Sequence, residues 1–340
     1  MITKPPTAGL SLLGSGWITA HGSGLESVWE KVRAGGRPEP GILPGLYGRA
    51  DAPYFPVPVP GDGGFARMRR SSAISCFALA AATAALEDAG FTPTGRTALI
   101  LASTNGAVIY TRKFFTDVVD RGTGSPIFFP ETVYNAPASH LAARFGIDTT
   151  ALTFVGDASA GTDALAAAAE LIGSGAADHC LVVAAEEADW LVYEAARSWG
   201  CAGGQGGPVF SEGAVALLVG APGGNAPQLS IHPGLTAGRS LPVREGLVRI
   251  LRDLATGGPP DLLMLSASGS RIDRAEAAAA EFVLPGIPRM APKRSLGEAF
   301  AVSTLAQVVC AALVARDGSS KCVAVPVAGW SGQLGGITVK

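Results

Sequence analysis

The stretch that decides the fold runs from Thr153 to Glu187 and reads TFVGDASAGTDALAAAAELIGSGAADHCLVVAAEE. An apolar strand enters a tight Gly-Asp-Ala-Ser bend, a long Ala-rich helix leaves it, and a second apolar strand follows. Such a bend places the residue at the helix start, here Ser159, beside backbone N–H groups that favour an oxyanion. The pattern predicts a strand–elbow–helix unit with Ser159 in the position of a candidate nucleophile.

The composition indicates a chain with a large buried core. The chain has 340 residues, of which 48% are hydrophobic and 16% charged, and its formal net charge is −2. These values exclude a disordered chain and provide no strongly basic surface for nucleic acid. No apolar run approaches the length of a membrane span. We therefore expect a globular protein without nucleic-acid or membrane partners.

The cysteines indicate a reducing compartment. Their number is odd and none has C-x-x-C spacing: Cys76, Cys180, Cys201, Cys310 and Cys322. The first twenty residues loosely resemble a signal peptide, but Pro5-Pro6 interrupts them and Leu10–Ile18 is predicted as a buried strand. We expect a cytoplasmic protein with reduced thiols, no metal site and no cofactor.

Short apolar strands alternate with Ala-rich helices along the chain. The predicted strands are Leu10–Ile18, Thr97–Ala102, Ala151–Val155, Cys180–Ala185, Ala214–Val219, Leu262–Leu265, Cys322–Val327 and Gly336–Val339. The predicted helices are Leu25–Ala34, Ser75–Ala89, Ala136–Phe145, Gly161–Gly173, Leu241–Ala255, Arg274–Phe282 and Phe300–Ala315. Gly36–Pro60 and Gly200–Pro208 are predicted as loops. This alternation favours a layered α/β fold with mainly parallel strands.

A helix–strand unit occurs twice. Thr162 and Thr304 are 142 positions apart, and so are Cys180 and Cys322, which follow the two helices. Related apolar runs, TALILAS and DLLMLS, precede both units. The repetition predicts two duplicated halves in one compact unit, residues 1–220 and residues 221–340.

The ordered set of motifs resembles the thiolase superfamily, and specifically the β-ketoacyl synthases. The similar segments are SLLGSGWITAHGSGLESVWEKVRAGG, MRRSSAISCFALAAATAALEDAGF, FPETVYNAPASHLAARFGI, the elbow, VFSEGAVALLV and GWSGQLGG. The resemblance covers nearly the whole chain. It implies a thiolase-like fold whose two halves form layered α-β-α-β-α architecture.

The chemistry of that family uses one cysteine and two histidines, and the resemblance locates all three positions. Ser159 stands in the place of the cysteine, Ser268 of LSASGS in the place of the first histidine, and Glu298 of KRSLGEAFA in the place of the second. Lys293 and Gly297 of the last segment are retained. The resemblance therefore implies a ketosynthase scaffold without its catalytic trio.

Ser159 has two interpretations. A hydroxyl needs a base to become a nucleophile, and Glu298 is the candidate if burial raises its pKa. Alternatively, Ser159 is the N-cap of the helix. The elbow departs from the G-x-S-x-G pattern of hydrolases because Asp157 stands where the first glycine would be.

Histidine offers no obvious replacement for the missing groups. The chain has four: His21, His140, His179 and His232. Each lies in a predicted core helix, in a turn or at a strand end. We interpret all four as structural or solvated.

Further site residues follow from the resemblance. Asn105, Phe128, Phe129, Phe210 and Ser331 are expected to bind the acyl substrate. Within Asn105–Val108 and Phe128–Tyr134, side chains are expected to line or cap the acyl tunnel of a partner subunit. The basic cluster Arg67, Arg69 and Arg70 is a candidate docking patch for an acidic acyl carrier protein, or a solvated helix start.

The resemblance extends to chain length factors, which are ketosynthase-like proteins that lack the cysteine and pair with an active ketosynthase. It implies a degenerate subunit that forms a heterodimer with a ketosynthase, or a homodimer, during fatty-acid, polyketide or aryl-polyene elongation. The strand Cys180–Ala185 is the expected dimer contact. The alternatives are an acyltransferase or thioester hydrolase acting through Ser159, and a non-catalytic homodimer that binds an acyl ligand.

Overall fold

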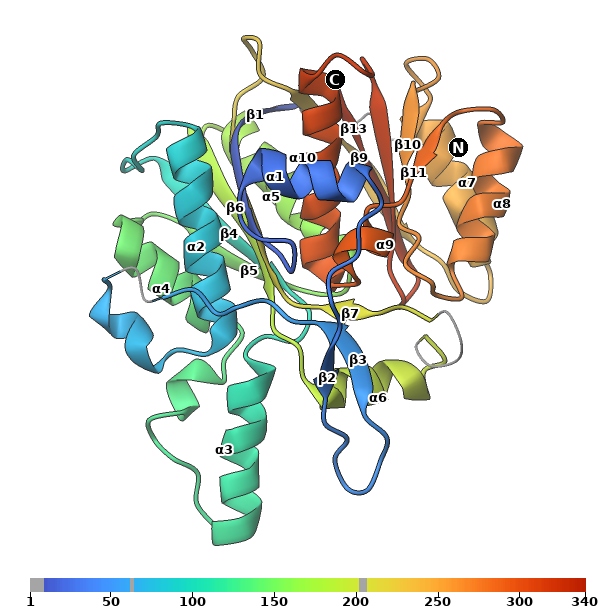
Figure 1. The fold of residues 1–340 in the computed structure, drawn as a ribbon. Coiled ribbons are helices and arrows are strands. Elements are labelled where there is room, and N and C mark those ends of the chain that lie inside the picture. The colour runs from blue at the N-terminus through green and yellow to red at the C-terminus, as the bar shows by residue number, and fades with distance from the viewer. Residues whose placement is uncertain (1–8, 62–63, 202–206) are drawn as a thin grey trace.

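The computed structural model describes residues 9–61, 64–201 and 207–340 (Figure 1). Its main sheet has ten strands in the order β11-β10-β12-β13-β9-β1-β8-β6-β4-β5. Their bounds are β1 Leu10–Ile18, β4 Thr97–Ser103, β5 Ala151–Val155, β6 His179–Glu186, β8 Gly213–Gly220, β9 Gln228–Thr236, β10 Leu262–Met264, β11 Arg289–Met290, β12 Val323–Ala328 and β13 Gln333–Val339.

The sheet consists of two halves with the same plan. The first half-sheet is β5-β4-β6-β8-β1 and the second is β11-β10-β12-β13-β9. In each, the outer two pairs are parallel and the next two antiparallel. The half-sheets join through the short pairing of Leu10 and Ser11 with β9. The duplication expected from the sequence is therefore visible in strand order and direction.

The prediction of mainly parallel strands was wrong for the centre of the sheet. From β12 to β6, in the order β12-β13-β9-β1-β8-β6, each strand pairs antiparallel with the next. The pairs β1–β8 and β12–β13 are antiparallel, so neither needs the crossover helix that joins parallel strands. The alternation of strands and helices along the sequence does not show which strands pair in this way.

Three helical layers and the two half-sheets make five layers, as the resemblance implied. The helices that build them are α1 Leu25–Arg33, α2 Ala73–Asp88, α4 Ala136–Phe145, α5 Ser159–Gly173, α7 Val243–Leu254, α8 Asp273–Val283 and α10 Phe300–Arg316. Helices α5 and α10 form the middle layer between the half-sheets (Figure 1). Helices α2 and α4 cover the first half-sheet, and α7 and α8 cover the second. The fold is the thiolase-like α/β fold.

In the middle layer, α10 carries mostly small and branched apolar residues and is buried over almost its whole length. Every residue of α10 from Phe300 to Val314 is buried. On the outer layer, β1 and α2 approach closely because Gly16 has no side chain: a Cβ there would lie 2.5 Å from the carbonyl oxygen of Ala81. Small residues thus determine how near these layers lie.

Several elements were not expected from the sequence. These are α3 Val108–Arg121, α6 Trp190–Ser198, the short α9 Lys293–Leu296, β9, β11, the 3₁₀ turns η1 Ala66–Arg70 and η2 Phe129–Glu131, and a small sheet of β2 Gly41–Leu43, β3 Ala52–Phe55 and β7 Phe210–Ser211. Two of these strands interrupt the predicted loop Gly36–Pro60. Of the predicted loop Gly200–Pro208, residues 202–206 lie outside the described residues.

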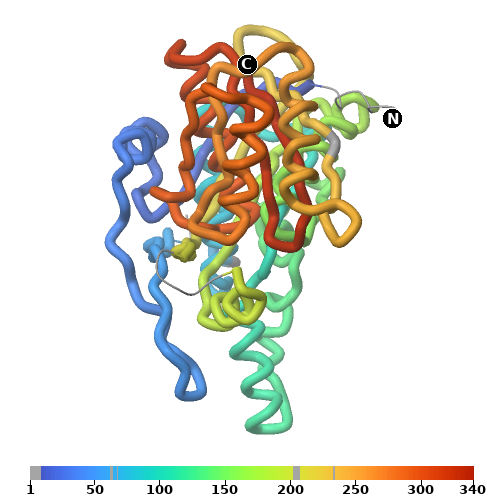
Figure 2. Tube along the Cα trace, turned by 90° about the vertical axis from the view of Figure 1, so that its right-hand side faces the viewer, coloured from blue at the N-terminus to red at the C-terminus, as the bar shows by residue number. Residues whose placement is uncertain are grey.

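Helix α3 projects from the body of the molecule (Figures 1 and 2). None of its residues is buried. We call α3 together with the segment 122–134 that returns from its tip the α3 arm.

The strand expected to form a dimer contact is internal. In β6, which contains Cys180–Ala185, every residue from Cys180 onward is buried, and the strand pairs with β4 on one side and β8 on the other. An internal strand has no unpaired N–H and C=O groups for another chain. That prediction was wrong, and the edge strand of the first half-sheet is β5.

No helix in the described parts of the chain combines the length and apolar character needed to cross a membrane.

Candidate active site

Ser159 lies at the start of α5, where the elbow turns from β5 into the middle layer. Its side chain is buried, and its Oγ donates a hydrogen bond to Oε1 of Gln333 at 2.8 Å. The N-cap residue is Ala158, and the hydroxyl of Ser159 accepts no backbone N–H. The N-cap interpretation was therefore wrong: the hydroxyl donates its hydrogen bond to Gln333 of β13 and does not cap the helix.

The glycine-rich loop after β12 closes over the elbow. Asp157 accepts hydrogen bonds from the backbone N–H of Ser159 and, through Oδ2, from the N–H and hydroxyl of Ser331. A side chain at Gly329 would overlap the Asp157 carboxylate, since its Cβ would lie 2.2 Å from Oδ1. Ser331, predicted to bind substrate, thus fastens this loop to the elbow.

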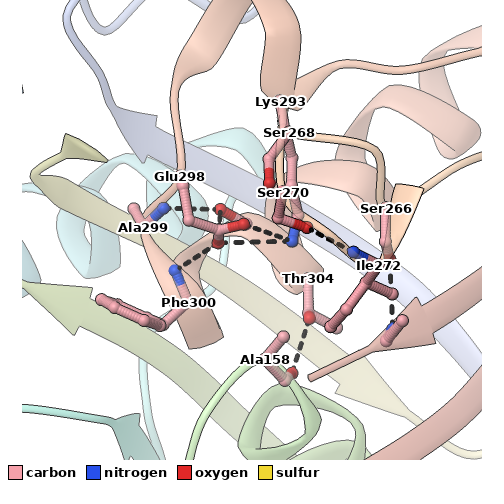
Figure 3. A network of polar contacts seen from close by, with 12 residues as sticks. Ala158, Ser266, Ser268, Ser270, Ile272, Lys293, Glu298, Ala299, Phe300 and Thr304 are labelled. Carbon is pink, nitrogen blue, oxygen red and sulfur yellow. Dashed lines mark hydrogen bonds and ion pairs between the residues drawn. The ribbon is translucent and has the colours of Figure 1, made fainter. Parts of the chain in front are cut away.

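The second half contributes a buried ion pair at the start of α10. Lys293 Nζ lies 3.1 Å from Oε2 and 3.3 Å from Oε1 of Glu298, and both side chains are about 2% exposed (Figure 3). Glu298 Oε1 also accepts hydrogen bonds from the Phe300 N–H and the Ser303 hydroxyl. Phe300 has a left-handed backbone with φ 48°, which this carboxylate helps to hold.

The geometry does not pair Ser159 with Glu298. Among the described residues, the hydrogen-bond partners of the Glu298 carboxylate are Lys293, Phe300 and Ser303, and the partner of the Ser159 hydroxyl is Gln333. The Glu298 carboxylate and the Ser159 hydroxyl therefore belong to separate hydrogen-bond networks. The two α helices do meet, because Thr304 Oγ1 of α10 donates to the Ala158 carbonyl at 2.6 Å (Figure 3).

Ser268 follows β10 and faces a cavity of about 830 Å³ that Lys293 also lines. Its Oγ is buried and has no hydrogen-bond partner within the described chain. Nearby, Glu276 of α8 accepts a bond from the Ser266 N–H at 2.8 Å. Burial raises the pKa of Glu276 to about 7, against the opposing effect of Lys293.

A second group of buried acids lies at the end of β6. Glu186 accepts bonds from the backbone N–H groups of Thr104 and Asn105 and from the Asn105 side chain. Burial raises the pKa of Glu186 to about 7, and these bonds oppose the rise. Glu186 and Asn105 line a cavity of only about 10 Å³, the room of a single water.

Four aromatic rings pack beside this small cavity. The ring centroids of Phe210 and Phe300 are 5.7 Å apart, and Trp330 lies 5.6 Å from Phe210 and 5.3 Å from Phe300. Tyr193 packs on Phe210 from α6. Phe210, predicted to bind substrate, is buried in this cluster.

Acidic residues after β6 also hold the base of the α3 arm. Glu187 accepts bonds from the Ile109 N–H at 2.7 Å and from Ser72 at the start of α2. Arg112 of α3 pairs with Asp189 at 2.8 Å. In the sequence, Glu186 and Glu187 are recognisable as a Glu-Glu pair at the end of an otherwise apolar strand.

Two of the predicted substrate residues, Phe128 and Phe129, lie on the α3 arm. Phe128 packs edge-on against Tyr110 at 5.1 Å, and Phe129, 57% exposed, contacts Phe114 at 5.5 Å. The predicted substrate set is therefore divided: Asn105 and Phe210 lie at the small cavity, Ser331 at the elbow, and the two phenylalanines on the arm.

The docking candidates lie on η1. Arg69 and Arg70 are exposed, and the side chain of Arg67 lies outside what the structure describes. The histidines have structural contacts. His140 Nε2 lies 2.8 Å from Glu131 Oε1, and His21 and His232 bond to Ser295 and Thr338.

Comparison with known proteins agrees with the fold. Residues 62–220 match the family described as beta-ketoacyl synthase, N-terminal domain. No curated protein sequence matches the chain significantly. Solved structures match it over almost its whole length, at 16–20% identity in the three cases that follow.

A β-ketoacyl synthase from Burkholderia phymatum STM815 has a TM-score of 0.85 at 16% identity. The ishigamide ketosynthase/chain length factor has a TM-score of 0.81 at 20% identity. The AntDE:AntF complex, a type II PKS acyl-carrier protein with its ketosynthase bound to the hexaketide, has a TM-score of 0.82 at 17% identity. Each match covers 98% of this chain and 99% of the other. The chain therefore has the β-ketoacyl synthase fold, and its residues 62–220 are similar to the β-ketoacyl synthase N-terminal domain.

Proposed function

We propose that the chain is a ketosynthase-like subunit that does not catalyse condensation itself and pairs with an active ketosynthase during acyl-chain elongation in the cytoplasm. The observation that supports this proposal most directly is the hydrogen bond from the Ser159 hydroxyl to Gln333. A serine nucleophile needs a base that takes its proton. An amide oxygen accepts a hydrogen bond but does not act as that base near neutral pH.

The other two family positions support the same proposal. Decarboxylation and condensation need donors that stabilise a developing oxyanion. Glu298 is an acceptor held by Lys293, so it offers no such donor. Ser268 could donate a hydrogen bond, but it cannot carry the positive charge of an imidazolium.

The surface of the first half-sheet favours a partner of the same fold. The edge strand β5 leaves one side unpaired, and Leu152 and Val155 are 37% and 54% exposed there. The α3 arm adds large apolar side chains, all more than two-fifths exposed: Phe115, Val119, Ile127, Phe129, Val133 and Tyr134. Apolar surface of this kind is typical of obligate interfaces.

We further propose that the arm limits the partner's acyl chain and that η1 receives the carrier protein. The segments Asn105–Val108 and Phe128–Tyr134 lie at the base and on the return of the arm, so they would face a subunit bound at β5. The exposed Arg69 and Arg70 would attract an acidic carrier.

The first test is intact mass spectrometry of the purified chain after exposure to acyl- and malonyl-carrier thioesters. The Ser159→Ala variant and a candidate ketosynthase that becomes acylated are measured beside it. We expect an adduct on the ketosynthase and none on this chain. An adduct on this chain that disappears in Ser159→Ala would refute the proposal and establish the alternative, an acyltransferase or thioester hydrolase acting through Ser159.

A further inference from the structure

Phe282 is a large apolar side chain on the outer surface of the second half. It lies near the end of α8, and it is 61% exposed. Helix α8 packs into the core through Ala279 and Ala280, whereas Phe282 is not part of that core. In Figure 1, α7 and α8 lie on the side of the molecule away from β5. The ring is therefore on a surface that the proposed pairing at β5 leaves free.

Two arginines of the neighbouring helix converge on this ring. Arg244 and Arg252 leave α7 about two turns apart, roughly 12 Å along the helix axis. Both side chains reach Phe282, because their guanidinium carbons lie 5.6 Å and 5.8 Å from the ring centroid. The two cations are therefore within about 11 Å of each other, beside one exposed apolar ring.

The contact with the ring leaves both guanidinium groups able to bind an anion. A guanidinium stacks on a ring through its flat face, so the N–H groups at its rim stay available. Arg244 lies 3.6 Å from the adjacent Glu245, an exposed pair that contributes little, and the described ion pairs include none at Arg252. Glu281, the acid next to the ring in the sequence, pairs with Arg289 at 2.6 Å. The surface around the ring therefore keeps a positive charge.

An exposed ring with two arginines has the composition of a protein-binding hot spot. Aromatic and arginine side chains are enriched at the centres of protein interfaces and supply much of their binding energy. The ring also holds two long side chains in place, so less conformational entropy is lost when a partner binds. Charge complementarity requires that partner to present carboxylates.

The spacing of the two arginines favours a helical partner. Two acids seven positions apart on a helix lie on one face, about 10.5 Å apart along the axis. This separation is within the reach of the two guanidinium groups beside Phe282. A residue three or four positions after the first acid lies on the same face, midway between the acids. An apolar side chain there would meet the ring.

We propose that Phe282, Arg244 and Arg252 form a docking site for an acidic helix of another protein. The helix would place one carboxylate on each guanidinium and an apolar side chain on the exposed ring. The inference does not depend on the proposed pairing with a ketosynthase or on docking at η1, because it uses no residue of β5, of the α3 arm or of η1.

The probe is a synthetic Ala-rich peptide of about 20 residues, long enough to form a helix. It carries two glutamates seven positions apart and a leucine midway between them on the same face. A second peptide of the same composition has its glutamates on opposite faces. Fluorescence anisotropy of the labelled peptides, titrated with the full chain at about 0.15 M salt, measures both affinities. We expect saturable binding of the first peptide and binding of the second that is at least about tenfold weaker, because only the first brings both acids to the arginines at once.

Arg244→Gln combined with Arg252→Gln should weaken binding of the first peptide about tenfold or more, since it removes both charge-assisted contacts. Phe282→Ala should weaken it about tenfold as well, because the apolar contact and the support of both arginines are lost. Arg249→Gln is the matched control. It removes one exposed charge from the same helix without changing the ring or its two arginines, so the affinity should stay within about twofold. All four side chains are exposed, so these variants should keep their fold, and a thermal melt verifies this.

Equal affinity for the two peptides would overturn the proposal, because it would reduce binding to a general attraction between charges. So would equal affinity in the double variant, or absence of saturable binding. Heparin and single-stranded DNA are titrated in parallel. If either binds more tightly than the first peptide and loses affinity in the double variant, the site recognises another kind of polyanion and the proposal of an acidic helix is wrong.

Discussion

Lys293 and Glu298 depend on each other, because each is buried and the other neutralises it. We expect Lys293→Met to lower the free energy of unfolding by about 3–5 kcal/mol, since it leaves the Glu298 carboxylate buried without its cation. Urea denaturation measures this loss. Adding Glu298→Gln keeps an acceptor for the Phe300 N–H and removes the charge, so the double variant should recover most of the stability. A double variant as unstable as the single one would contradict this account.

Two other buried acids make stability depend on pH. Burial raises the pKa values of Glu186 and Glu276 from the ordinary 4.5 to about 7. Between these values the folded state binds more protons than the unfolded state. The stabilisation is therefore complete below about pH 4.5 and is lost as the pH rises toward 7.

We expect Glu186→Gln to flatten this part of the profile. Each acid should contribute a slope of up to about 1.4 kcal/mol per pH unit between the two pKa values. Chemical denaturation at pH 5, 6 and 7 measures the slope in the wild type and the variant. An unchanged slope in Glu186→Gln would show that this carboxyl titrates normally.

At the scale of elements, the contact between β1 and α2 rests on a glycine. A methyl group at Gly16 would lie 2.5–2.7 Å from atoms of Ala81, Ala84 and Ala85, all on α2. We expect Gly16→Ala to cost roughly 1–3 kcal/mol, because the helix must move away from the sheet. Gly95→Ala is the control, since nothing lies within 4 Å of a Cβ there. Equal unfolding midpoints for the two variants would disprove this packing constraint.

Most of the elements that the sequence predicted have buried apolar faces; β5 is an exception, because none of its residues is buried. β1, β5 and α4 have the predicted bounds, and the other predicted helices agree within two residues. The α3 helix was missed because it buries no residue, so the core leaves no apolar period in its sequence. β9 was missed because Pro233-Gly234 interrupts its apolar run.

The parts of the site that could not be predicted are long-range. Ser159 was placed correctly at the start of the helix, but its partner Gln333 is 174 residues away. Likewise, the apolar run of β6 indicates that the strand is buried, but it does not show whether the strand lies inside the sheet or at its edge. For this reason the prediction of a dimer contact at β6 was wrong. Sequence spacing along one element does not encode which distant residue meets it.

At the scale of the whole molecule, both halves share one core. The largest apolar cluster contains residues of β1, α5, α10 and β12 together. We therefore expect one cooperative unfolding transition, with tryptophan fluorescence and far-UV circular dichroism giving coincident curves in urea. Two separated transitions would mean that residues 1–220 and 221–340 fold independently.

The proposed pairing has a test at this scale as well. Leu152→Lys combined with Val155→Lys places two charges on the open edge, and we expect this variant to lose co-purification with its ketosynthase partner. Its melting temperature alone should stay close to that of the wild type, because both side chains are partly exposed. Ile42→Lys, on the small sheet, is the matched control and should retain the partner. Retention by the double variant would move the interface away from β5.

The two ends of the main sheet are unequal, which bears on the proposed pairing. β5 offers five residues at one end, whereas β11 has only two at the other. A partner of the same fold that adds its own β5 uses the long edge of both subunits at once. Each subunit can then join one partner through its β5 edge, so the addition of strands ends with a dimer and does not continue into a filament.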